Sequence, residues 1–243
     1  MPQWGNLAAK AVVAGGGERQ TSAMSGAQAL SPVLYEFHRS SASYRVRIAL
    51  NLKQIAVQQH PLVLRRGEQR SAEYLALNPQ GLVPMLQMGS VTLTQSLAII
   101  QYLDEVYPDP PLLPTSAADR AFVRWIALTI ACDIHPLNNL RVLKYLEEDL
   151  RSDTASRDHW YLHWIAEGFE TLEKTLSSDK RVGSFCYGDR PGLADVCLVP
   201  QYYNAERLRC PLEMYPTLSR MVATARAHPA FIAAEPERQP GAQ

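Results

Sequence analysis

The stretch that decides the fold is Ser40-Ser41-Ala42-Ser43-Tyr44-Arg45-Val46-Arg47. It follows Val33-Leu34-Tyr35-Glu36-Phe37, a short run typical of a strand, and it opens a segment whose apolar spacing predicts an amphipathic helix. The first turn of a helix has free backbone N–H groups, which serine side chains cap. The same groups bind anions, helped by the positive end of the helix dipole. The stretch therefore predicts either a simple helix cap or a site for a phosphate, a carboxylate or a thiolate.

The composition excludes several classes of function. In a chain of 243 residues, 24 Lys and Arg balance 24 Asp and Glu, so no net charge attracts nucleic acid or an anionic membrane. No apolar run approaches the roughly 20 residues that span a bilayer. The four cysteines form no C-x-x-C pair and suggest neither a zinc site nor a disulfide framework. We therefore expect a cytoplasmic protein with no metal site and no nucleic-acid or membrane partner.

Changes in composition divide the chain into four parts. Residues 1–30 are rich in Ala, Gly, Ser and Gln and are expected to be a disordered extension, with Met24 as a possible natural start. Residues 31–107 predict a compact α/β domain with the order strand, helix, strand, helix, strand, strand, helix. Residues 108–115 carry four prolines and predict a linker. Residues 116–243 predict an all-helical domain.

Within the α/β domain, turn and breaker residues set the expected elements. Pro61 limits the run 57–64 to an edge strand. Ser71 is the expected cap of a short helix that ends at the turn Asn78-Pro79-Gln80-Gly81. The runs 82–88 and 91–94, joined by Gly89-Ser90, predict a hairpin.

In the second domain, apolar periodicity predicts a series of helices. The predicted ranges are 119–134, 137–150, 156–176, 193–207 and 216–227. The very apolar segment 193–207 is expected to be the buried central helix of the bundle, and 216–227 is expected to be the last clear helix.

Several long motifs together resemble one family. They are Ser40-Ser41-Ala42-Ser43-Tyr44-Arg45-Val46-Arg47-Ile48-Ala49-Leu50-Asn51-Leu52-Lys53, Leu77-Asn78-Pro79-Gln80-Gly81-Leu82-Val83-Pro84, Thr94-Gln95-Ser96-Leu97-Ala98-Ile99-Ile100, Cys132-Asp133-Ile134-His135-Pro136-Leu137-Asn138-Asn139 and Asn204-Ala205-Glu206-Arg207. Over about residues 34–240 the chain resembles the zeta-class glutathione transferases, closest to bacterial maleylacetoacetate isomerases. The resemblance implies the glutathione transferase fold: a thioredoxin-like N-terminal domain that binds glutathione, followed by a helical-bundle C-terminal domain that binds the second substrate. It also implies a homodimer.

The resemblance assigns glutathione-binding roles to specific residues. It implies that Ser40 and Ser41 hold the thiolate, that the Val83-Pro84 bond is cis and presents the Val83 backbone, and that Gln95 and Ser96 grip the γ-glutamyl carboxylate. It places His135 and Asn139 along the cleft between the domains. For His135, packing at a helix end beside Pro136 is the alternative.

The implied reaction converts the cis double bond of maleylacetoacetate into the trans bond of fumarylacetoacetate. Addition of the glutathione thiolate lowers the bond order, rotation follows, and expulsion of the thiolate regenerates glutathione. Ser41 is the expected thiolate-stabilising residue, with Ser40 beside it. Arg39 and Arg207 are the expected partners of the dicarboxylate, with Arg141 as a further candidate. Ala42 stands where eukaryotic members carry cysteine, so the nucleophile is expected to be the glutathione sulfur alone.

Other functions remain open at the level of sequence. Maleylpyruvate differs from maleylacetoacetate in length, which the sequence does not resolve. A general glutathione transferase that conjugates electrophiles such as α-haloacids is a second class, and a non-enzymatic scaffold is a third. The intact set of serines, Val83-Pro84 and Gln95-Ser96 argues against the scaffold.

Overall fold

The computed structural model describes residues 31–242 of the chain. The predicted disordered extension, residues 1–30, lies outside the described residues. Within the described range, no helix has the length and apolar character needed to cross a membrane.

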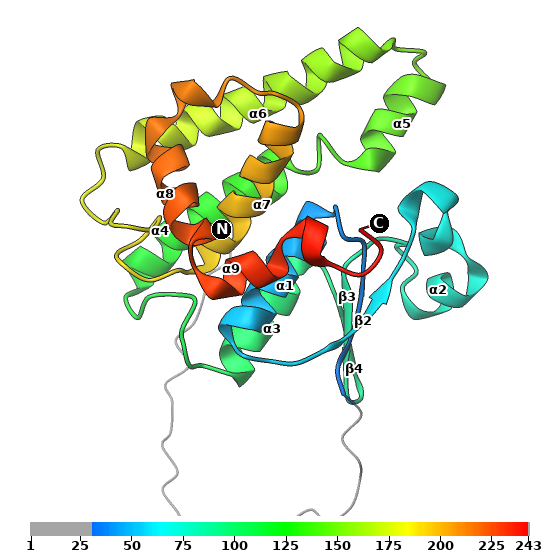
Figure 1. Cartoon of the computed structure of the whole chain (residues 1–243), viewed down its shortest axis with the longest axis horizontal. Helices are drawn as coiled ribbons and strands as arrows, with labels where there is room; N and C mark the ends of the chain where they lie inside the picture. Colours follow the sequence, from blue (N-terminus) through cyan, green and yellow to red (C-terminus); the bar gives the residue numbers. More distant parts are fainter. Residues whose placement is uncertain (1–30, 243) are drawn as a thin grey trace, which may run out of the picture.

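The N-terminal half is a four-stranded sheet with helices packed against it (Figure 1). The elements in order are β1 Val33–Glu36, α1 Ser41–Leu52, β2 Gln58–Pro61, the 3₁₀ turns η1 Leu64–Arg66 and η2 Glu68–Arg70, α2 Ala72–Leu77, β3 Met85–Met88, β4 Val91–Thr94 and α3 Ser96–Val106. The strand order is β2-β1-β3-β4, with β1 parallel to β2 and the other pairs antiparallel. This is the predicted element order of a thioredoxin-like domain, and β2, which ends at Pro61, is an edge strand as predicted.

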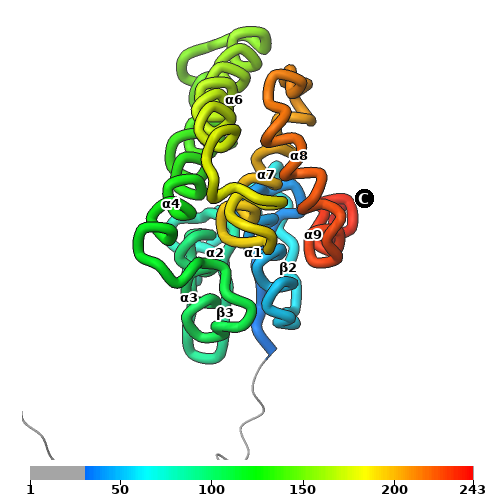
Figure 2. Tube along the Cα trace, turned by 90° about the vertical axis from the view of Figure 1, so that its left-hand side faces the viewer, coloured from blue at the N-terminus to red at the C-terminus, as the bar shows by residue number. Residues whose placement is uncertain are grey.

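The C-terminal half is helical. Its elements are α4 Ala117–Leu128, the π-helix η3 Thr129–Ile134, α5 Leu140–Glu148, α6 Thr154–Leu176, α7 Leu193–Arg207, η4 Leu212–Met214, α8 Pro216–Arg226, α9 Pro229–Ala234 and η5 Pro236–Arg238. Figure 2 shows α7 lying between α4 and α8. Most residues of α7 are buried, which confirms the prediction of a central helix.

Several helices begin at residues other than the predicted ones, because capping side chains set their first residues. The predicted helix 137–150 begins only at Leu140, because the Asn139 side chain caps α5 by accepting a hydrogen bond from the N–H of Arg141. The predicted helix 156–176 begins two residues earlier, because Asp153 is its cap. The predicted helix 119–134 begins at Ala117, after the cap Ser116, and changes to a π-helix at Thr129. The prediction that 216–227 is the last helix is wrong, because α9 follows it with Pro229 in its first turn, where proline is tolerated.

Helix α1 joins the two halves. It packs against α3 of the first domain and against α7 and α9 of the second (Figure 1), and one continuous apolar core runs through both halves. At its C-terminal end, the buried Lys53 ammonium donates to Asp104 and to the carbonyl oxygens of Tyr107 and Pro110, each at 2.6 Å. The C-terminal end of α1 is therefore held to the end of α3 and to the segment that follows it.

Candidate functional site

The two serines at the start of α1 have different local roles. Ser40 has extended backbone geometry and is the N-cap, since its oxygen accepts a hydrogen bond from the Ser43 N–H at 3.2 Å. Ser41 is the first helical residue, and its Oγ lies 2.9 Å from Nδ1 of His135. The Ser40 oxygen is thus engaged in the cap, whereas the Ser41 hydroxyl faces the helical domain.

His135 stands at the end of the π-helix η3, where its N–H donates to the carbonyl of Ile130. Burial, together with the positive charges of Arg45 and Arg141, lowers the pKa of His135 to about 3. The imidazole is therefore neutral at physiological pH. When its proton is on Nδ1, His135 donates to Ser41, and the serine proton stays free for another acceptor. His135 therefore contacts Ser41 from the helical domain.

Helix α6 fixes the position of His135 through the residues on either side of it. The Asn138 amide donates to the Tyr161 carbonyl at 3.2 Å, and the Trp160 indole donates to the Leu137 carbonyl at 2.9 Å. On the other side, Ile134 lies so close to Gly168 that a Cβ at Gly168 would be 2.2 Å from the Ile134 Cδ1 atom. A glycine is costly within a helix, and here it makes room for η3.

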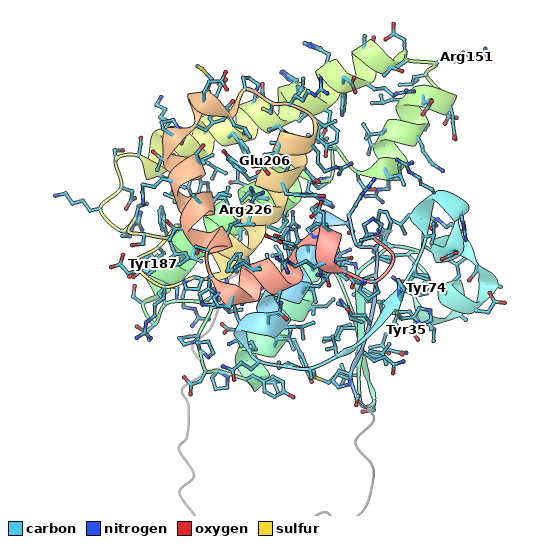
Figure 3. The ribbon with its side chains drawn as sticks, in the orientation of Figure 1. Tyr35, Tyr74, Arg151, Tyr187, Glu206 and Arg226 are labelled. Atoms are coloured by element: carbon cyan, nitrogen blue, oxygen red, sulfur yellow. The ribbon has the colours of Figure 1, made fainter. Side chains whose placement is uncertain are left out.

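A second part of the site is the loop before β3. The Val83-Pro84 peptide bond is cis, as predicted. The Leu82 carbonyl accepts hydrogen bonds from the Tyr74 hydroxyl at 2.6 Å and from the Asn78 amide at 2.8 Å. Tyr74 is in turn packed against Tyr35 of β1 (Figure 3). The N–H and C=O groups of Val83 have no hydrogen-bond partner among residues 31–242, so they are free to pair with an extended ligand.

The third part is the start of α3. Gln95 precedes the helix with a φ of 67°, an uncommon conformation for a residue other than glycine. Its side-chain amide donates to Gln80 at 3.1 Å. Ser96 is buried, and its hydroxyl accepts a hydrogen bond from Arg45 at 3.4 Å. The free N–H groups of this helix start favour an anion.

The predicted arginines act on two different histidines. Arg39 and Arg207 are exposed, and both charges, after burial, contribute to lowering the pKa of His38. The Arg207 guanidinium also lies 5.8 Å from the centre of the Tyr203 ring. Arg141 is exposed in the first turn of α5 and acts on His135. Arg39 and Arg207 therefore lie near one histidine, His38, and Arg141 lies near another, His135.

Comparison with known proteins agrees with this geometry. A family model described as the N-terminal domain of glutathione S-transferase matches residues 34–111. A probable maleylacetoacetate isomerase from Vibrio cholerae is 51% identical over 215 residues, which cover 88% of this chain and 99% of that protein. The chain belongs to the zeta-class glutathione transferases.

Two solved structures have the same fold. A bacterial maleylpyruvate isomerase in its holo form has a TM-score of 0.85 at 42% identity, covering 87% of this chain and 100% of that one. A maleylacetoacetate isomerase from Methylobacterium extorquens AM1, with bound malonate and glutathione, also has a TM-score of 0.85, at 40% identity, covering 87% of this chain and 99% of that one.

The structure of this zeta-class transferase adds a residue that sequence reasoning passed over. Arg45 is buried, lies next to Ser96 and acts on His135. Its signal in the sequence was the four-residue spacing from Ser41, which puts both residues on one face of the helix. By contrast, a hollow of about 800 Å³ lies at the opposite end of α1, beside Asn51 and His228, and is lined by none of the predicted site residues.

Proposed function

We propose that this chain is a glutathione-dependent cis–trans isomerase that converts maleylacetoacetate into fumarylacetoacetate. The observation that carries the proposal is the Ser41 hydroxyl, placed at the N-terminus of α1 and paired with a neutral His135. A hydroxyl donor and a helix N-terminus both favour the charged form of a thiol.

The residues around Ser41 fit glutathione. The unpaired backbone groups of Val83 suit an extended peptide. Ser96 and the start of α3, with Gln95 beside it, suit a carboxylate such as that of the γ-glutamyl group. From the helical domain, His135 contacts Ser41, and Asn139, whose side chain caps α5, is a further candidate for binding glutathione.

Glutathione supplies a thiolate, whose reversible addition to the maleyl double bond allows rotation about that bond. The protein's part is to stabilise the thiolate and to hold a dicarboxylate still. Ser41 donates to the sulfur, with Ser40 keeping the helix start in place. Arg39 and Arg207 bind carboxylate groups, and Arg141 adds a further positive charge. Ala42 provides no thiol, so no protein sulfur competes at this position.

The relatives support both the cofactor and the substrate class. The relative from Methylobacterium extorquens binds glutathione together with malonate, a small dicarboxylate. Its combination of ligands is the one expected for an enzyme that places a thiolate beside a dicarboxylic acid.

Maleylpyruvate is the second candidate substrate, favoured by the similarity to the maleylpyruvate isomerase structure. The purified protein, with glutathione, is tested on maleylacetoacetate and on maleylpyruvate, with an α-haloacid as the conjugation substrate. The proposal expects a higher kcat/KM with maleylacetoacetate than with the other two. A higher value with maleylpyruvate would change the substrate, and activity with the haloacid alone would overturn the isomerase proposal.

We also infer that the protein acts as a homodimer in the cytoplasm. Apolar side chains remain exposed on α5 and just after it, including Tyr145 and Leu150, and a second copy would cover such a surface. Sedimentation at equilibrium should give twice the mass of the chain, and a monomer at micromolar concentration would contradict the dimer.

The inference of a cytoplasmic location rests on the cysteines. All four are unpaired, as expected in a reducing compartment.

A further inference from the structure

Arg45 is a buried positive charge for which the described residues, 31–242, supply no matching negative charge. Its side chain is 1% exposed. Nη1 makes one long hydrogen bond, 3.4 Å to Ser96, and Nε and Nη2 have no partner among the described residues. No carboxylate within residues 31–242 forms an ion pair with it. Buried charges in proteins are normally paired, because removing a charge from water is costly.

The other buried cations of the same helix show the usual arrangement. Arg47 is paired with Glu36 and donates to the carbonyls of Ala234 and His38. Lys53 has Asp104 and two carbonyl oxygens. Within the described part of the chain, Arg45 therefore differs from Arg47 and Lys53, each of which has a carboxylate partner.

The position of Arg45 is beneath the proposed thiol site. It follows Ser41 by four residues, so the two side chains share a face of α1, and helical side chains lean toward the helix N-terminus. Ser96 of α3 contacts it from one side. Cys132 and His135 of η3 and Cys197 of α7 are the titratable groups that face it from the helical domain. Burial raises the pKa of Cys197 to about 11, so no thiolate of this residue neutralises the arginine at physiological pH.

We propose that Arg45 is a positioning residue whose fixed, buried positive charge stabilises the anionic form of the glutathione bound between Ser41 and Ser96. The inference rests on the proposed function and extends it. Glutathione brings both a carboxylate and a thiolate, and these are negative charges of the kind that residues 31–242 do not supply to Arg45. The buried charge then lowers the stability of the glutathione-free protein, and the bound anion offsets this loss.

The test compares Arg45→Met, Arg45→Lys and the control Lys53→Met, which removes a buried and paired cation from the other end of α1. Two quantities are measured: the melting temperature without glutathione, and the pKa of the bound glutathione thiol from its ultraviolet thiolate absorbance. Arg45→Met should melt at or above the wild-type temperature and should raise the thiol pKa by about 1 to 3 units, the effect of removing a nearby opposite charge. The thiol pKa in Arg45→Lys should lie between the values in Arg45→Met and in the wild type. Lys53→Met should melt lower and leave the thiol pKa unchanged.

An Arg45→Met variant that is unfolded or clearly less stable would overturn the inference, because the arginine would then be a structural residue. An unchanged thiol pKa in Arg45→Met would overturn it as well. So would a thiol pKa in Arg45→Lys that is raised as much as in Arg45→Met. The wild-type protein shows whether the proposed function itself has failed. In that case the wild type would neither bind glutathione nor isomerise the substrate. The melting temperatures of the glutathione-free proteins would still report on the unpaired charge.

Discussion

The side chain that distinguishes this site is the Ser41 hydroxyl, because its neighbour Ser40 is engaged in capping α1. A hydrogen bond to a charged group contributes roughly 1.5–3 kcal/mol. We therefore expect Ser41→Ala to lower kcat/KM by about 10- to 150-fold and to raise the pKa seen in the pH–rate profile. The matched control is Ser43→Ala, since Ser43 is buried in the same turn and its hydroxyl has no partner in the described part of the chain. Equal losses in the two variants would contradict the role of Ser41.

His135 makes the stability of the protein depend on pH. Its folded-state pKa of about 3 lies below the ordinary value of 6.5, so the unfolded chain binds a proton between these values and the folded protein does not. The free energy of unfolding should therefore fall as the pH is lowered from 6.5, by up to about 1.4 kcal/mol per unit for this one group. His38, whose pKa is also lowered by burial, acts in the same direction.

Urea unfolding at several pH values between 6.5 and 5 measures this slope. His135→Asn should reduce it, and His38→Asn should reduce it less. An unchanged slope in the His135 variant would show that this imidazole is protonated in the folded protein.

Among the elements, α6 holds η3, and with it His135, in place beside the start of α1. Gly168→Ala should push Ile134 and the adjoining His135 away, because the new Cβ would lie 2.2 Å from an Ile134 carbon. Overpacking of this kind costs about 1–3 kcal/mol, and a shift of about 1 Å at a reacting group lowers rates up to about 10²-fold. Thermal unfolding and kcat/KM measure the two effects. Glu170→Ala, at an exposed position of α6, should change neither, and a Gly168→Ala variant with wild-type kcat/KM would contradict the coupling.

Periodicity and turn residues predicted most elements, including the hairpin, the edge strand β2 and the central α7, because each has a strong local pattern. The starts of α5 and α6 depend on the side chains of Asn139 and Asp153, which periodicity does not report. The π-helix and the short α9 follow from packing between distant segments. Of the site, the family resemblance predicted the cis Val83-Pro84 bond. It did not predict the Ser41–His135 hydrogen bond or the Arg45–Ser96 contact, because these join residues that lie 94 and 51 positions apart in the chain.

At the scale of the whole molecule, the C-terminal segment fastens the helical domain to α1 and the sheet. Arg47 donates to the Ala234 carbonyl and Asn51 to the Ala230 carbonyl, at 3.0 and 2.9 Å. Gln239 accepts a hydrogen bond from Gln59 of the edge strand at 2.8 Å. We expect the two domains to unfold together.

Arg47 is central to this connection, because it also pairs with the buried Glu36. Burial raises the pKa of Glu36 even beside Arg47, so the carboxylate depends on its partner. Arg47→Met should cost about 3–5 kcal/mol of unfolding free energy, and the double variant Glu36→Gln/Arg47→Met should recover part of the loss. The control is Arg226→Met, which breaks the exposed pair of Arg226 with Glu206 (Figure 3) and should cost no more than about 1 kcal/mol. Equal losses of unfolding free energy in Arg47→Met and Arg226→Met would contradict the importance of the buried pair.

The most direct test of the whole account is whether glutathione is required and returned. Purified protein is mixed with excess maleylacetoacetate and a substoichiometric amount of glutathione, and both the trans product and free glutathione are followed by chromatography. The account predicts complete conversion into fumarylacetoacetate, no conversion without glutathione, and full recovery of the free thiol. Consumption of glutathione into a stable adduct, or conversion that needs no glutathione, would contradict it.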